Sequence, residues 1–148
     1  MMETIAQVLE RKGGRIFAVA PQASILDALA VMAEHDIGAV LVLENDRLVG
    51  IFSERDYARK VVLKGLVSRD VQVTQLMTPQ PQTVSPASTV EEVMNLMTEN
   101  RFRHLPVVQN DQLIGIVSIG DMVKSMVLQQ ERTIRQLSSY IAGDLAAE

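Results

Sequence analysis

Leu48-Val49-Gly50-Ile51-Phe52-Ser53 is the stretch that decides the fold, because it returns 65 positions later as Leu113-Ile114-Gly115-Ile116-Val117-Ser118. The offset holds without a gap between residues 19–63 and 84–128, with 14 identities in 45 positions. Self-similarity at one fixed offset indicates a duplicated structural unit. We therefore interpret the chain as two copies of one unit.

Each copy shows the same order of patterns. A short extended piece (residues 16–20 or 82–84) is followed by apolar residues at helical spacing, then by two apolar runs separated by a polar turn at 44–47 or 109–112. Ser24 and Thr89 each precede an acidic residue by three positions, which is the pattern of a helix N-terminal capping box. The two apolar runs predict a β-hairpin, and a second helix is expected over 54–63 and from residue 119 onward.

The predicted fold class is α+β, with two β-α-β-β-α repeats packed face to face with pseudo-twofold symmetry and a C-terminal helix. A repeat of this size buries little apolar surface alone, which favours one module of two packed copies. We assign residues 1–72, with an N-terminal helix, to repeat 1 and 73–148 to repeat 2, and residues 65–75 to the connector. The C-terminal helix is expected over 121–141 with Gly143 as its stop, its outer half closing the core or packing on another subunit.

Composition excludes several classes of function. The 148-residue chain has no cysteine and two histidines, which argues against disulfides, thiolate zinc sites and an imidazole metal cage. The longest apolar run, residues 37–43, is too short to span a membrane, and no secretory signal is evident, so a cytoplasmic location is the expectation. The net charge of −4 disfavours nucleic-acid binding.

Both copies place a serine at the end of a strand and an aspartate three residues later, as Ser53 with Asp56 and Ser118 with Asp121. Helix capping alone explains this spacing. A carboxylate held at such a turn also suits the two hydroxyl groups of a ribose. The phosphate of a nucleotide would then need cations elsewhere, for which we single out Arg101, Arg103 and His104.

The doubled Gly-Ile-x-Ser-x-x-Asp, the Met77-Thr78-Pro79 stretch and the run from Arg103 to Val108 resemble a tandem cystathionine β-synthase-type (CBS) domain pair, or Bateman module, of the small stand-alone bacterial type. The resemblance covers essentially the whole chain. It implies two clefts between the repeats that bind AMP, ADP, ATP, NAD(H) or S-adenosylmethionine, with AMP first. It also implies a homodimer.

Carried over to this sequence, the resemblance assigns Asp121 and Asp56 to ribose and Ser118 and Ser53 to nearby hydroxyl or phosphate groups. Arg103 and His104 would meet phosphate and Thr83 the base or phosphate. Three apolar residues would lie near the base, namely Ile37, Phe102 and Pro106. Because copy one has Ala18, Gly38, Ala39 and Leu41 where copy two has Thr83, Arg103, His104 and Pro106, we expect the Asp121 cleft to bind more tightly.

The resulting hypothesis is a non-catalytic sensor of adenine nucleotides that acts on a separate, unidentified protein, without a protein-bound metal. An enzyme is disfavoured, since His104 and the serines lack a nucleophile elbow and an orienting partner. The alternative is a ligand-independent dimeric scaffold that interacts through the C-terminal helix or through a face bearing Met32, Met77 and Met97.

Overall fold

The computed structural model describes residues 3–147, which form two compact units. The hairpin unit contains residues 14–84 and 105–116, and the α6 unit contains the remaining described residues. The elements in chain order are α1 (Ile5–Lys12), β1 (Ala18–Val19), α2 (Ile25–His35), β2 (Ala39–Glu44), β3 (Arg47–Ser53), α3 (Glu54–Asp56), the π-helical η1 (Tyr57–Val62), α4 (Val73–Leu76), β4 (Thr78–Pro79), α5 (Val90–Asn100), β5 (His104–Gln109), β6 (Gln112–Ser118) and α6 (Ile119–Ala147). The predicted α+β class, with two repeats and a C-terminal helix, is confirmed.

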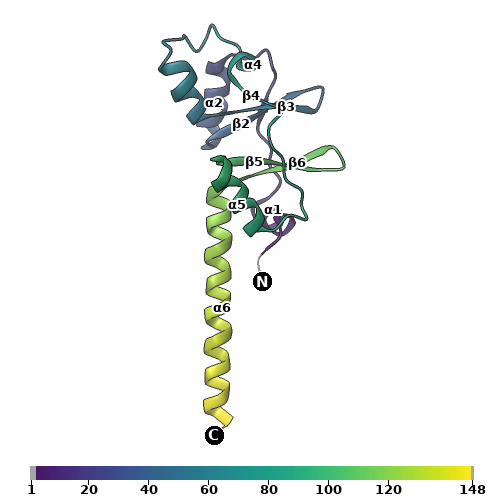
Figure 1. The fold of residues 1–148 in the computed structure, drawn as a ribbon, viewed down its shortest axis with the longest axis vertical. Coiled ribbons are helices and arrows are strands. Elements are labelled where there is room, and N and C mark those ends of the chain that lie inside the picture. The colour runs from purple at the N-terminus through teal and green to yellow at the C-terminus, as the bar shows by residue number, and fades with distance from the viewer. Residues whose placement is uncertain (1–2, 148) are drawn as a thin grey trace. The chain divides into compact units, whose positions relative to one another are not determined.

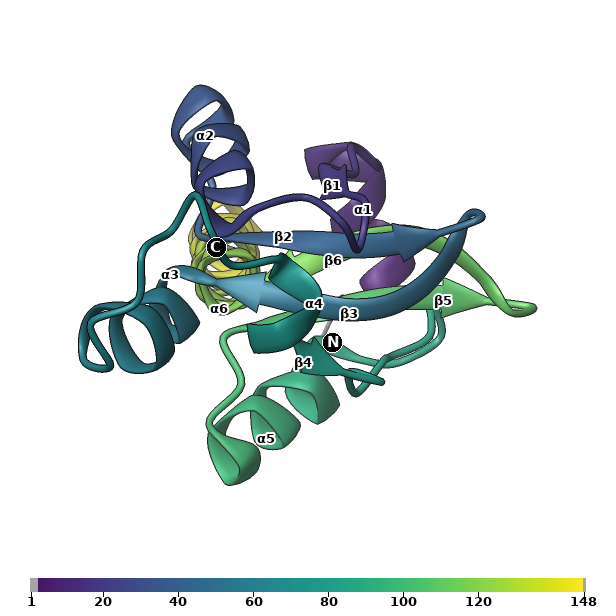
Figure 2. The same ribbon diagram turned by 90° about the horizontal axis from the view of Figure 1, so that it is seen from above.

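The hairpin unit is built on a sheet with strand order β1-β2-β3-β4. Strand β1 pairs parallel with β2, whereas β2 with β3 and β3 with β4 pair antiparallel. Figure 2 shows β2 and β3 side by side, with α4 next to β3. The core of this unit combines the inner faces of α2, β2 and β3 with residues that follow them, namely Ile25, Ala28, Met32, Val40, Val42, Phe52, Val61 and Val73.

Both predicted hairpins are confirmed, and both turn through the same dipeptide. Asn45 and Asp46 have φ of 51° and 63°, and Asn110 and Asp111 have φ of 51° and 62°. Two successive left-handed residues make the turn whose twist matches that of the flanking strands, and Asn and Asp tolerate this region better than most residues. The repeated Asn-Asp therefore fixes the register of each hairpin.

The predicted capping boxes of α2 and α5 are also confirmed. The Ser24 side chain accepts from the Asp27 amide and the Asp27 carboxylate accepts from the Ser24 amide, and Thr89 and Glu92 make the same pair of bonds. Each box satisfies two amides that the first turn of a helix would leave without partners.

The α6 unit joins α1, α5 and α6. The amide of Ile5 donates to the Ser88 carbonyl at 2.8 Å and that of Val90 to the Glu3 carbonyl at 2.9 Å, so the segment before α1 runs beside the start of α5. Figure 1 shows α6, green to yellow, continuing well beyond α1 and α5. The expected stop at Gly143 is wrong, since α6 runs to Ala147. A glycine costs a helix stability without removing a backbone hydrogen bond, so it weakens a helix but does not end it.

Two short helices occupy matching places in the two units. Val73 of α4 donates to the Ala23 carbonyl at 2.7 Å, as Ile5 of α1 donates to Ser88, which lies 65 positions after Ala23. The expected connector 65–75 thus already contains the start of α4. The helix expected over 54–63 is a single α-helical turn followed by the π-helical η1, in which Leu63 donates to the carbonyl of Ala58, five residues earlier.

Candidate functional site

The start of α6 holds Asp121 in a fixed position. The Ser118 amide donates to Asp121 Oδ2 at 2.8 Å, and the Asp121 amide donates to Ser118 Oγ at 3.2 Å. These are the reciprocal bonds of a capping box, and a carboxylate in the first helical turn is further stabilised by the helix dipole. The Asp121 side chain is 20% exposed, so a ligand can reach it although its position is fixed.

Lys12 is the cation closest to this carboxylate. Its Nζ lies 2.7 Å from Asp121 Oδ2, and it is the last residue of α1. The sequence interpretation missed Lys12, because 109 residues separate the two side chains and no local pattern links them. Asp121 Oδ2 is therefore already bonded to an ammonium group.

His104 lies within reach of the charges of Asp121, Lys12 and Arg103. Burial lowers the pKa of His104 below its ordinary value of 6.5; Asp121 opposes this shift, and Lys12 and Arg103 add to it. The carbonyl oxygen of Arg103 accepts a hydrogen bond from the Ile119 amide at 2.9 Å. This bond connects the Arg103 backbone to the first residue of α6. At neutral pH the cluster therefore offers two cations, one carboxylate and a mainly neutral imidazole.

Arg101 and Phe102 lie at the end of α5. Arg101 is the C-terminal cap of that helix, exposed and left-handed with φ of 58°. Phe102 is half-buried and donates its amide to the Met97 carbonyl. Both therefore lie in the segment that leads into Arg103 and His104.

The first repeat contains a similar helix start in the hairpin unit. Asp56 Oδ2 accepts from the Ser53 amide at 3.0 Å and from Ser53 Oγ at 3.1 Å. Its lysine is Lys60, one turn further along, with Nζ 3.2 Å from Asp56 Oδ1. The Glu54 amide donates to the Gly38 carbonyl, next to half-buried Ile37, in the same way that Ile119 donates to Arg103.

Thr83 and Pro106 also belong to the hairpin unit. The amide of Val84 donates to the Pro106 carbonyl at 3.0 Å, so Thr83 comes immediately before the residue that bonds to β5. Pro106 is buried and Thr83 half-buried. Of the predicted site residues, the structure brings Ser118, Asp121, Arg103 and His104 together in the α6 unit, and Ser53 and Asp56 together in the hairpin unit.

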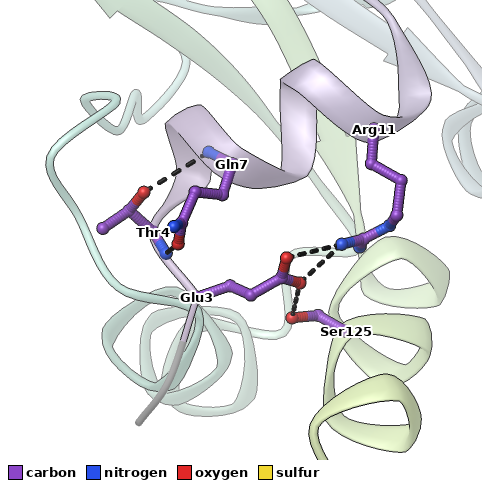
Figure 3. A network of polar contacts seen from close by, with 5 residues as sticks. All are labelled: Glu3, Thr4, Gln7, Arg11 and Ser125. Atoms are coloured by element: carbon purple, nitrogen blue, oxygen red, sulfur yellow. Dashed lines mark hydrogen bonds and ion pairs between the residues drawn. The ribbon is translucent and has the colours of Figure 1, made fainter. Parts of the chain in front are cut away.

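A buried network places the helix that carries Lys12 (Figure 3). Both carboxylate oxygens of Glu3 accept from Arg11 Nη1 at 2.6 Å, and Oε1 also accepts from Ser125 Oγ of α6 at 2.6 Å. Burial on its own would raise the pKa of Glu3, but the bonds from Arg11 and Ser125, with the charges of Arg11 and Arg132, hold it below its ordinary value of 4.5. The network therefore joins Arg11, near the end of α1, through Glu3 to Ser125 of α6.

Two features of the described residues bear on the class of site. Between residues 3 and 147, no three His, Asp or Glu side chains are grouped so that they could hold a metal ion. No helix in the described part of the chain has the length and apolar character required to cross a membrane.

Comparison with known proteins agrees with the duplication. The CBS domain family matches residues 5–63 and 73–128. The mitochondrial CBS domain-containing protein CBSX3 of Arabidopsis thaliana is 37% identical over 149 residues, covering 95% of this chain and 72% of that protein. The CBS domain-containing protein YhcV of Bacillus subtilis is 32% identical over 131 residues, 87% of this chain and 84% of its own.

A solved structure gives the same result. A protein of Burkholderia ambifaria described as a signal-transduction protein with CBS domains is 45% identical, with a TM-score of 0.83 over 86% of this chain and 96% of its own. The two matched segments contain the two duplicated stretches, residues 19–63 and 84–128. The chain therefore belongs to the CBS domain family and carries a tandem pair of CBS domains.

Proposed function

We propose that this protein is a non-catalytic regulatory module that binds an adenine nucleotide at the Asp121 cluster and acts on a separate protein. The observation that carries the proposal is the fixed, partly exposed Asp121 carboxylate with Lys12, Arg103 and His104 around it. Homologues with a CBS domain pair are regulatory or signal-transduction modules, which supports the general role.

The chemistry of the cluster favours a ribose with an attached phosphate. Asp121 would accept both hydroxyl groups of the ribose, and a phosphate would pair with Lys12 and Arg103 and accept a hydrogen bond from neutral His104. To reach Asp121 Oδ2, the ribose must displace Lys12, whose charge then becomes available to the phosphate. We propose AMP as the first ligand, ahead of ADP, ATP or NAD(H).

The remaining predicted residues keep the roles that the family resemblance gives them. We assign Ser118 and Thr83 to hydroxyl or phosphate contacts, and Phe102, Pro106 and Ile37 to the neighbourhood of the base. Arg101 is a further phosphate candidate. Asp56 with Ser53 would form a second, weaker site, because Gly38 and Ala39 stand where the stronger site has Arg103 and His104.

Regulation would act through the packing of the two repeats in a cytoplasmic homodimer. A ligand can shift the equilibrium between two packing arrangements of the repeats only by its difference in binding free energy for the two arrangements. The alternative function is a ligand-independent scaffold, favoured by the exposed apolar residues on α6. The two functions differ in their response to nucleotides.

Isothermal titration of the nucleotide-stripped protein with AMP, ATP, NAD, NADH and S-adenosylmethionine tests the proposal. We expect saturable binding of AMP at one site per chain. The absence of heat and of any thermal shift with all five compounds would overturn the proposal in favour of the scaffold. Turnover of a nucleotide by the pure protein would contradict the non-catalytic assignment.

A further inference from the structure

The outer part of α6 carries an apolar row that the described chain leaves uncovered. Every residue from 130 to 143 is exposed. Four apolar side chains are about half exposed or more, with Val127 at 47%, Ile134 at 62%, Leu137 at 58% and Ile141 at 58%. A solvated helix is only marginally stable in water without tertiary packing, so a row of this kind favours a partner.

The spacing of the row is that of a coiled-coil seam. Val127, Ile134 and Ile141 recur every seven residues, which makes them a positions of a heptad, and the d positions between and before them are Val123, Gln130 and Leu137. Such a repeat winds two helices into a left-handed supercoil. The β-branched residues at all three a positions, with a leucine at one d position, Leu137, favour two parallel strands.

Gln130 and Glu131 also discriminate between pairing directions. In a parallel, in-register pair Gln130 faces Gln130 of the second copy, and two amides can hydrogen-bond to each other. An antiparallel pair that sets Ile141 opposite Val123 instead places Gln130 against Ile134 and brings the two Glu131 charges close together. A single polar residue in the seam is a known device for fixing register.

The seam extends beyond the part of the chain that matches the family, which ends at residue 128. We propose that residues 123–143 of α6 form a parallel two-stranded coiled coil with a second copy of this chain. This contact is independent of nucleotide binding and adds to any contact made through the CBS domains.

The absence of cysteine makes the test direct. In the full-length protein, Leu137→Cys places one thiol in the seam, where the parallel pair sets it against the same residue of the second copy. Gln136→Cys is the matched control on the outer face. We expect Leu137→Cys to form a disulfide-linked dimer at least about tenfold faster than Gln136→Cys under mild oxidation, because a disulfide needs Cα atoms about 4.4–6.8 Å apart.

Sedimentation equilibrium gives the second measurement. The double variant Ile134→Glu with Leu137→Glu should dissociate at a higher protein concentration than the wild type, whereas Gln136→Glu with Ser139→Glu on the outer face should not. Equal cross-linking of the two cysteine variants would overturn the proposal, since an antiparallel pair sets Leu137 opposite Val127. A monomeric wild type would also overturn the proposal, and the apolar row of α6 would then have to pack against a different protein.

Discussion

Asp56 and Asp121 occupy equivalent positions in the two repeats, yet their lysines come from different parts of the chain. Lys60 reaches Asp56 from the next turn of its own helical segment, whereas Lys12 reaches Asp121 from α1. The residue that corresponds to Lys60 in the second repeat is Ser125, which instead binds Glu3 beside the start of α1. At this position the first repeat thus has a local lysine, whereas the second has a serine that bonds to Glu3, next to the helix that carries Lys12.

The comparison shows what duplication preserves and what it leaves open. The Ser-x-x-Asp start is retained because it caps a helix, a role that each repeat needs independently. The cation is not retained at its position, because any element that packs beside the carboxylate can supply it. The two carboxylates are therefore paired with lysines from different elements although both helix starts keep the same cap.

The largest effect is expected from Ile5→Ala, which tests the docking of α1. The substitution truncates a fully buried side chain of that helix. A truncation of this kind costs about 2–5 kcal/mol, depending on how well the cavity collapses. We expect denaturant unfolding to show a loss in this range, and Val73→Ala in the equivalent helix α4 to lower stability too. Glu10→Ala, at an exposed position of α1, is the control. No loss with Ile5→Ala would contradict the docking of α1.

Glu3→Gln tests the buried network that joins Glu3 to Arg11 and to Ser125 of α6. Hydrogen bonds to a charged group contribute about 1.5–3 kcal/mol, so we expect a loss of stability near that range at neutral pH. Because the pKa of Glu3 is lowered in the folded protein, its contribution is complete above the ordinary value of 4.5 and is lost as the pH falls through the folded value. The difference between wild type and variant should therefore shrink in acid. A difference independent of pH would contradict the charged network.

Asp121→Ala against Asp56→Ala tests the difference in affinity directly. Loss of the charged hydrogen bonds at Asp121 should weaken AMP by about 1–3 kcal/mol in isothermal titration, with a much smaller effect at Asp56. Asp121→Asn, which can still accept from the Ser118 amide, controls for the lost cap. Equal effects at the two aspartates would contradict the expected difference in affinity between the two sites. Unchanged AMP affinity in Asp121→Ala would contradict the assignment of Asp121 to the binding site.

The smallest effects are expected from the two lysines. Partly exposed ion pairs contribute about 0.2–1 kcal/mol, and a pair one turn apart on a helix about 0.3–0.5 kcal/mol. Lys12→Ala and Lys60→Ala should therefore change stability little. Only Lys12→Ala should speed hydrogen exchange of the amides near the end of α1. The same exchange rates in both variants would mean that the Lys12 contact does not help to hold α1.

Local features were predictable from the sequence. These features are the Asn-Asp turns, the capping boxes and the two Ser-x-x-Asp helix starts. Each depends on residues within three or four positions of one another, so the sequence pattern alone predicts the interaction. The duplication made each of these inferences stronger because each pattern occurs twice.

Contacts between distant segments were not predictable. The ion pair of Lys12 with Asp121 joins residues 109 positions apart. The bond between Glu3 and Ser125 spans 122 positions. No local sequence pattern around any of these residues predicts its partner. The π-helical η1 and the continuation of α6 through Gly143 were missed for a different reason. Apolar spacing does not distinguish closely related helical forms, and a glycine signals a helix end only when a left-handed cap follows.

The docking of α1 onto α6 has a consequence for synthesis of the chain. Glu3 leaves the ribosome 122 residues before Ser125, its partner in the buried network. At about 5–20 residues per second, this leaves a delay of about 6–24 s. During that time the side chains of Ile5 and Val8, fully buried in the finished protein, lack part of the structure that buries them. The apolar side chains of the N-terminal segment therefore reach their final burial only after α6 has been made.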